Sequence, residues 1–283
     1  MLHHPPVHLS APSGGSWFFT GLCVAIFAGA VIWALVRASR GDRFGLVALA
    51  GGLVASLIEA QLDNLGLLWY ATNNHAILFH SFGVSMPLYV VLGYGFYFGA
   101  ITYFTLYSLR QGKQSRYLWG IYAFGVIFDW ALETTGGEIG LYRYFGPQPY
   151  RVLTEPLWWL FVNPALPIAA GGLFHVMGER LRGWRLLSIV ALLPMVYGAT
   201  YGAIAWPMFV SLHSRVPGSV IWVAGAVTAG FALLYVKLVI TGLEWHRRMT
   251  RTDASIEVVP AAAADAGASI EVPRRAPVTP VAT

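Results

Sequence analysis

The apolar residues of this chain lie in long, nearly continuous runs instead of alternating with polar ones. Each run has about the 20 residues that an α-helix needs to cross ~30 Å of hydrocarbon. The runs occupy residues 16–37, 44–65, 84–109, 117–135, 156–177, 186–211 and 217–243. This pattern predicts an all-α fold: a polytopic membrane protein with seven transmembrane helices.

Basic residues follow alternate runs. Clusters of Arg and Lys follow the first, third, fifth and seventh runs. No basic residue follows the second, Arg143 and Arg151 lie in the longer fourth connection, and Arg215 alone follows the sixth. The positive-inside rule then predicts an N-terminus outside and a cytoplasmic C-terminus. We expect an extracytoplasmic segment at 1–15, a transmembrane domain at 16–248 and a disordered cytoplasmic tail at 249–283, which is rich in Ala, Pro, Val and Thr. Residues 1–15 have no Lys or Arg, so we expect the first helix to be retained.

Composition supports the membrane class. Hydrophobic residues make up 57% of the chain and charged residues only 11%, which predicts a multi-pass protein of the cell membrane. The net charge of +5 does not predict a nucleic-acid partner, because the basic residues lie in short clusters between apolar runs. Cys23 is the single cysteine and cannot close an intrachain disulfide.

Two of the runs contain acidic pairs. Glu59 and Asp63 lie in the second run, and Asp129 and Glu133 in the fourth, each pair at positions i and i+4 on one helical face. From the cytoplasmic ends, helical rise places them roughly 22, 28, 18 and 24 Å deep. No Lys or Arg lies at that depth, since Lys237 is near the cytoplasmic end of the last helix. Burial and mutual repulsion favour a proton shared between the carboxyls, the state that a general acid needs, so these four are our candidate catalytic residues.

Aromatic and amide side chains occur at the same depth. Aromatic faces attract cations, and an apolar chamber that they line suits a hydrocarbon substrate. An interfacial aromatic belt and structural hydrogen bonding by the acids are the alternatives. The candidate substrate-binding residues are Asn163, Tyr89, Tyr94, Tyr97, Trp130, Trp159, Tyr197 and Tyr201.

Two connections on the outer side contain further polar residues. The connection 134–155 is long and rich in glycine, which is typical of a lid; its charged residues are Glu138, Arg143, Arg151 and Glu155. In the connection 61–86, His75 and His80 are five residues apart and do not share a helical face. This spacing does not predict a metal site, and we expect no metal and no cofactor.

Three functional classes fit a membrane protein with buried acids. The first is an enzyme that protonates an alkene or epoxide of a lipid, and the second is a proton- or cation-coupled transporter that uses the same acids. Transport is disfavoured because the runs show neither an internal repeat nor an interrupted helix. A retinal protein is excluded because Lys237 lies roughly 30 Å from the outer end of its helix.

The sequence around Glu59, Leu57-Ile58-Glu59-Ala60-Gln61-Leu62-Asp63, lies on the second helix of a short chain rich in aromatic residues. In these features and its span number the chain resembles the small seven-span membrane-bound terpene cyclases of meroterpenoid pathways. The resemblance implies that Glu59 is the acid that protonates a prenyl chain. The family's second acid is expected on a late helix; this chain instead has Asp129 and Glu133 on the fourth helix.

A carotenoid-type hydratase or cyclase is an alternative, because it is also a polytopic membrane enzyme that acts on polyenes. Asp129-Trp130-Ala131-Leu132-Glu133 is not an Asp-Asp-x-x-Asp run that binds magnesium diphosphate, so we predict chemistry that begins with protonation. The sequence thus predicts a cyclase, isomerase or hydratase, in the lyase or isomerase classes, that acts on an isoprenoid or other prenylated lipid.

Overall fold

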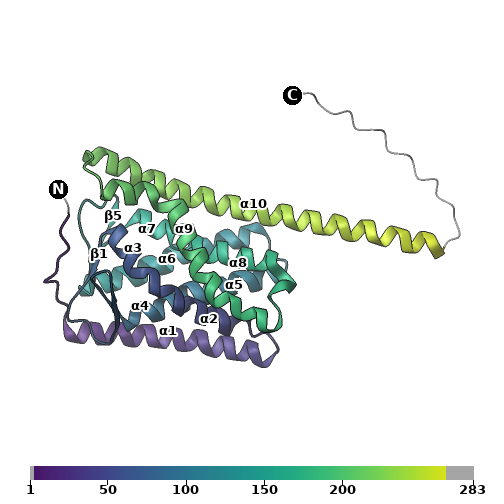
Figure 1. Cartoon of the computed structure of the whole chain (residues 1–283), viewed down its shortest axis with the longest axis horizontal. Coiled ribbons are helices and arrows are strands. Elements are labelled where there is room, and N and C mark those ends of the chain that lie inside the picture. Colours follow the sequence, from purple (N-terminus) through teal and green to yellow (C-terminus); the bar gives the residue numbers. More distant parts are fainter. Residues whose placement is uncertain (1–2, 266–283) are drawn as a thin grey trace. The chain divides into compact units, whose positions relative to one another are not determined.

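The computed structural model describes residues 3–265, most of which lie in helices (Figure 1). The chain divides into a first unit, Met1–Thr241, and a second unit, Gly242–Thr283. The second unit contains the last part of α10 (Gly218–Asp265). We expected a disordered tail at 249–283, but the helix continues through the alanine-rich residues 261–264, which favour helix. Residues 266–283 lie outside the described residues.

The helices of the first unit lie within about one turn of the expected runs. Helix α1 is followed by α2, the 3₁₀ segment η1 and α3, and then by α4, the π-helical segment η2 and α5. The remaining helices are α6, α7 with α8, and α9, which follows two 3₁₀ segments, η3 and η4. The bounds are α1 Ser13–Ser39, α2 Phe44–Ala55, η1 Ser56–Ile58, α3 Glu59–Gly66, α4 Leu88–Gly93, η2 Tyr94–Ala100, α5 Ile101–Arg110, α6 Ser115–Ile139, α7 Leu157–Val162, α8 Ala165–Met177, η3 Gly178–Leu181, η4 Gly183–Ser188 and α9 Ile189–Leu212.

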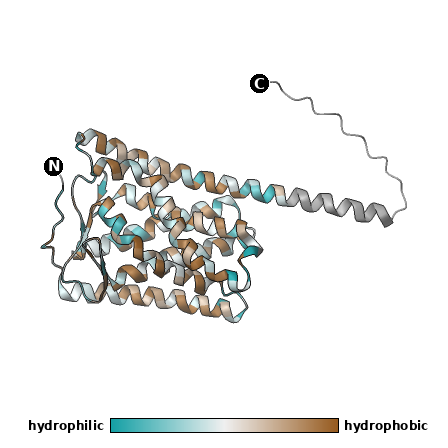
Figure 2. Ribbon diagram, in the orientation of Figure 1, coloured by the Kyte–Doolittle hydropathy of each residue, from teal (hydrophilic) through white to brown (hydrophobic). Residues whose placement is uncertain are grey.

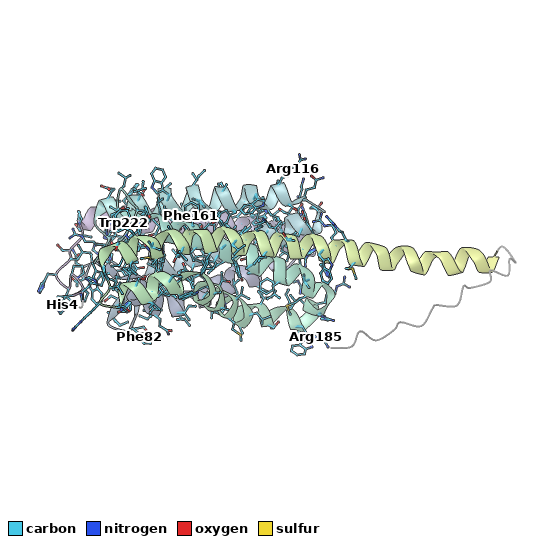
Figure 3. All side chains as sticks on the ribbon, turned by 90° about the horizontal axis from the view of Figure 1, so that it is seen from above. His4, Phe82, Arg116, Phe161, Arg185 and Trp222 are labelled. Atoms are coloured by element: carbon cyan, nitrogen blue, oxygen red, sulfur yellow. The ribbon has the colours of Figure 1, made fainter. Side chains whose placement is uncertain are left out.

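The two ends of this unit differ in structure. One end contains the N-terminal segment and the short β-strands, and we call it the strand end. The opposite end contains the connections 40–43, 111–114 and 178–188, and we call it the arginine end. Figure 3 shows His4 and Phe82 at the strand end, and Arg116 and Arg185 at the arginine end.

Strands occur in connections where the sequence predicted none, and one of them, Val84–Pro87, replaces the start of an expected helix. They form three antiparallel pairs: β1 (Leu68–Tyr70) with β4 (Tyr142–Tyr144), β2 (Ile77–Ser81) with β3 (Val84–Pro87), and β5 (Arg151–Val152) with β6 (Glu155–Pro156). The β2–β3 hairpin turns at Phe82 and Gly83, which both have positive φ, as a two-residue hairpin loop requires. The expected helix at 84–109 therefore begins only at Leu88, and the fold is helical with small sheets at one end.

Three of the expected helices are interrupted, contrary to the sequence analysis. The second changes to 3₁₀ geometry at η1, the third contains the π-helical η2, and the fifth breaks at Asn163 and Pro164 between α7 and α8. Pro164 has no N–H and its ring would clash with the carbonyl of Leu160, which explains the last break. Irregular backbone at membrane depth is tolerated where it is buried in protein or lines a cavity.

Close backbone packing holds α2 in the middle of the unit, against η2 and α9. A Cβ atom on Gly52 would lie 2.6 Å from the carbonyl oxygen of Tyr94, and one on Gly99 would lie 2.7 Å from that of Ala48. Small residues of this kind let helices approach each other within a membrane.

Six described helical segments are long and apolar enough to cross a membrane: Ser13–Ser39, Phe44–Gly66, Leu88–Arg110, Leu157–Met177, Gly183–Leu212 and Gly218–Thr250. Helix α6 is not among them, because Asp129 and Glu133 lower its mean hydropathy. Large apolar side chains such as Ile32 and Met195 are exposed on these helices, and Figure 2 shows hydrophobic residues along them. Such surfaces are typical of a protein embedded in lipid.

Candidate functional site: a cluster of buried carboxyls

Five carboxyl side chains gather in the half of the first unit nearer the strand end. Glu59 and Asp63 come from α3, Asp129 and Glu133 from α6, and Glu155 from β6. Asp63 and Glu155 are fully buried, Asp129 is 4% exposed and Glu59 8%, while Glu133 is partly buried. The i, i+4 spacing turns both members of each helical pair toward the same side.

Glu133 connects the cluster electrostatically. Its charge acts on Glu59, Asp63, Asp129 and Glu155, and the charge of Glu59 acts on Asp63 and Asp129. Within residues 3–250, none of the four carboxyls on α3 and α6 forms an ion pair with Lys or Arg. The fold therefore concentrates acids from two helices and one hairpin without a neighbouring cation on the helices.

Glu59 begins α3 directly after the 3₁₀ segment η1 and is held by tyrosine hydroxyls. The Tyr94 hydroxyl donates a hydrogen bond to Glu59 Oε2 and also contacts the Tyr197 hydroxyl. The rings of Tyr94 and Tyr197 lie 5.0 Å apart. Tyr70, on β1, lies close to both Glu59 and Asp63.

Asp129 is held through the break between α7 and α8. Asn163 lies at that break, where its Nδ2 donates to Asp129 Oδ2 at 2.8 Å, and the Tyr201 hydroxyl donates to Asn163 Oδ1. Tyr197 and Tyr201 are one turn apart on α9, with ring centroids 4.9 Å apart. Hydrogen bonds thus join Glu59 to Tyr94 and Tyr197, and Asp129 to Asn163 and Tyr201, and the two runs meet where the rings of Tyr197 and Tyr201 pack together. We call Tyr94, Tyr197, Tyr201 and Asn163 the tyrosine–asparagine chain.

Asp63 and Glu155 have buried oxygens without hydrogen-bond partners among the described residues. A buried polar group left unpaired costs about 1–3 kcal/mol, and more if it is charged. Burial, reinforced by the charges of Glu133 and Asp129, raises the pKa of Glu155 from 4.5 to about 10, so this carboxyl is protonated at neutral pH. The Tyr144 hydroxyl, on the adjoining sheet, is also buried and lies close to Glu155.

The predicted substrate-binding residues do not all lie at the cluster. Trp159 is buried, with its ring centroid 5.3 Å from that of Tyr201 and 6.1 Å from that of Tyr144. The hydroxyl of Tyr97 donates to the backbone oxygen of Gly125, and that of Tyr89 accepts a hydrogen bond from Asn74. Trp130 is 37% exposed on the surface of α6.

The predicted lid residues divide into surface and buried groups. Glu138 is exposed on the last turn of α6, which extends four residues beyond the expected 135, to Ile139. Arg143 and Arg151 are exposed on β4 and β5, and Arg151 donates to the Tyr144 carbonyl at 2.8 Å. Glu155 instead faces the carboxyl cluster, and the pairing of β1 with β4 ties this connection to the preceding one.

Tyr70, Tyr142 and Tyr144 were not predicted as site residues. Tyr142 and Tyr144 alternate with exposed Arg143 on β4, so both are buried, and the Tyr142 hydroxyl donates to the backbone oxygen of Glu133 at 2.7 Å. The period of two in Tyr142-Arg143-Tyr144 is a strand signal that would have revealed this shared face. Burial raises the pKa of both tyrosines well above the ordinary range, so both hydroxyls keep their protons as donors.

The histidines in the connection 61–86 have local contacts. The His75 ring stacks on Trp17, with centroids 4.8 Å apart, and His80 Nδ1 lies 3.0 Å from Ser85 Oγ. Among the described residues, no group of three or more His, Cys, Asp and Glu side chains has an arrangement that could hold a metal ion.

Comparison of the chain with protein-family models, curated proteins and solved structures finds no match. Evidence on function therefore comes from the chain's own geometry. Buried carboxyls that accept hydrogen bonds from hydroxyls and an amide can hold a proton and deliver it within an apolar surrounding.

Proposed function

We propose that this chain is a membrane-embedded enzyme that protonates an alkene or epoxide of an isoprenoid lipid. In this proposal α6 crosses the bilayer as a seventh span, the strand end faces the exterior and the arginine end faces the cytoplasm of a multi-pass cell-membrane protein. The positive-inside rule supports this orientation, since Arg40 and Arg43 lie in the connection 40–43 at the arginine end and Arg116 lies at the same end (Figure 3). The acids then lie in the outer half of the membrane.

The observation that supports this function most is the tyrosine–asparagine chain between Glu59 and Asp129. An enzyme of this class needs a protonated carboxyl as donor and a second carboxyl that takes the final proton. The chain connects two such groups from different helices. The aromatic rings beside it, including Trp159, offer electron-rich faces to a developing carbocation.

In the proposed reaction, a carboxyl of the Asp129–Glu133 pair, together with Glu59, gives its proton to a substrate carbon or epoxide oxygen, and a carbocation forms. Loss of a proton from a neighbouring carbon to the carboxylate then gives a cyclised or isomerised product of unchanged mass. Capture by water instead gives a hydrated product, with one proton returned to the carboxylate. Asp63 tunes or reprotonates the donor, and Asn163 positions Asp129. The resemblance to membrane-bound terpene cyclases supports the same class.

The test uses purified protein or membranes incubated with prenylated alkene and epoxide substrates, with extracts examined by mass spectrometry. Glu59→Gln and Asp129→Asn each keep a hydrogen-bond acceptor at the mutated position, so we expect folded protein with turnover at least about 100-fold lower, the usual scale of general acid catalysis. Glu138→Gln, an exposed acid on α6, is the matched control and should retain full turnover. Unchanged product formation in both site variants would refute the assignment.

A proton- or cation-coupled transporter remains a second candidate, because the break at Asn163 and Pro164 places an interrupted helix beside the acids. Interrupted helices are common at transport sites. Proteoliposomes loaded with a pH-sensitive dye separate the two functions. Proton flux that Asp129→Asn abolishes, in preparations that form no isomerised or hydrated lipid, would favour transport over catalysis.

A further inference from the structure

A large polar pocket lies at the arginine end, remote from the carboxyl cluster. Its volume is about 1090 Å³, and its walls come from the α1–α2 connection, the end of α5 and the region from α8 to η4. Basic side chains predominate among its charged residues, which are Arg40, Arg43, Arg110, Arg182, His175 and Asp42.

The one acid among these residues is already paired. Asp42 lies 3.8 Å from the Arg37 guanidinium and 3.6 Å from that of Arg110, and it accepts a hydrogen bond of 2.9 Å from the Tyr103 hydroxyl. Arg40 and Arg43 are exposed, and the described part of the chain provides no ion-pair partner for either of them. The pocket therefore retains positive charge at its mouth.

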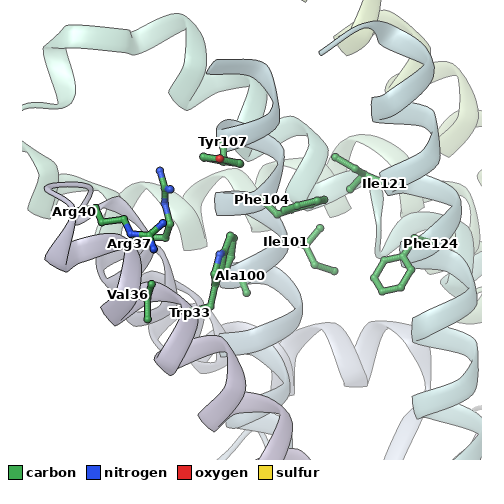
Figure 4. Close-up of a pocket in the computed structure, with 10 residues that line it drawn as sticks. All are labelled: Trp33, Val36, Arg37, Arg40, Ala100, Ile101, Phe104, Tyr107, Ile121 and Phe124. Carbon is green, nitrogen blue, oxygen red and sulfur yellow. The ribbon is translucent and has the colours of Figure 1, made fainter. Parts of the chain in front are cut away.

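An apolar groove of about 510 Å³ adjoins this pocket. Figure 4 shows its two walls: Trp33 and Val36 of α1 on one side and Phe124 of α6 on the other, with residues of η2 and α5 between them. Arg40 lines both the groove and the polar pocket. A further hollow of about 470 Å³ shares Phe104 and Phe124 with the groove, so the apolar surface continues along α6.

We propose that an anionic phospholipid of the leaflet at the arginine end binds here, with its phosphate between Arg40 and Arg43 and an acyl chain in the groove. Arginine guanidinium groups suit phosphate oxygens, and basic pockets at the cytoplasmic side of membrane helices recognise anionic headgroups. The arrangement of positive pocket, shared arginine and apolar groove matches a molecule with one charged end and a long apolar chain. This site is independent of the proposed catalytic function.

The test uses the full chain in nanodiscs of phosphatidylcholine with a minor fraction of phosphatidylglycerol, followed by native mass spectrometry of the released protein. We expect phosphatidylglycerol to be retained well above its bulk share. Each arginine near the surface contributes about fivefold to the affinity, so Arg40→Gln with Arg43→Gln should weaken retention roughly 25-fold. Arg185→Gln removes a charge from the same end without touching the pocket, and should retain the lipid.

A second pair of variants tests the groove independently. Ala100→Phe fills the groove and should also abolish retention, whereas Ala123→Phe, an exposed residue of α6 outside the groove, should not. Equal loss in the Arg185→Gln control, or equal retention of phosphatidylcholine, would overturn the proposal. Retention by Ala100→Phe together with displacement by inorganic phosphate would also overturn it, because the pocket would then bind phosphate without a lipid tail.

Discussion

Replacing Glu155 by glutamine tests whether the strand end buries a neutral carboxyl beside the acids of α6. Glu155 is fully buried on β6, with neither oxygen hydrogen-bonded by a described residue. Its pKa is about 10 in the folded chain, mainly because of burial, against 4.5 for an ordinary glutamic acid. Glutamine has nearly the same shape and is neutral at every pH of interest, so the variant removes only the titration.

The sign of the pH dependence follows from linkage. The folded chain holds the Glu155 proton more tightly than the unfolded chain, so this contribution to stability is complete below about pH 4.5 and is lost as the pH rises toward 10. Within that window the free energy of unfolding falls by about 1.4 kcal/mol per pH unit. Between about pH 6 and about pH 8 the loss is therefore roughly 3 kcal/mol.

The assay follows unfolding in mild detergent by tryptophan fluorescence at several pH values. The midpoint of unfolding of the wild type should fall as the pH rises. The midpoint of Glu155→Gln should fall less steeply, because the contribution of Glu155 to the pH dependence is gone. Glu138→Gln, which replaces an exposed acid, should keep the wild-type slope. If Glu155→Gln and the wild type showed the same slope, the buried neutral carboxyl at β6 would be disproved.

Two further pairs of substitutions test the packing and the aromatic wall. A Cβ on Gly125 would lie 2.6 Å from Pro164 Cβ, so Gly125→Ala should destabilise the chain by about 1–3 kcal/mol in thermal unfolding. On the same helix, a Cβ on Gly120 would meet no atom within 4 Å, so Gly120→Ala should be neutral or stabilising. Trp159→Leu should lower turnover about tenfold through the loss of a cation–π face, while Trp130→Leu, at an exposed position, should leave it unchanged. Equal melting of the two alanine variants, or equal turnover of the two leucine variants, would contradict these contacts.

The helices were the most predictable part of the fold, because each is encoded by a local apolar run. The positions of Glu59 and Asp129 along their helices also follow from residue offsets. Their connection across the fold does not, since it depends on where η2, α9 and the break after α7 place the tyrosine–asparagine chain.

The strand end was least predictable. Glu155 lies one residue before an apolar run, and nothing in the local pattern distinguishes a lid residue from one that faces inward. Its burial arises because the β5–β6 hairpin turns toward the acids of α6. The break at Pro164 was not predicted, because apolar residues continue on both sides of it. The hydropathy pattern therefore predicts one helix where the backbone forms two.

The most direct measurement is infrared spectroscopy of the purified protein at neutral pH, in the region of the C=O stretch of protonated carboxylic acids. A general acid must hold its proton before the substrate reacts. We predict a band that shifts on exchange into deuterium oxide and loses intensity in Glu59→Gln or Asp129→Asn but not in Glu138→Gln. A spectrum without a protonated-carboxyl band, or one that neither site variant changes, would contradict protonation by the buried cluster.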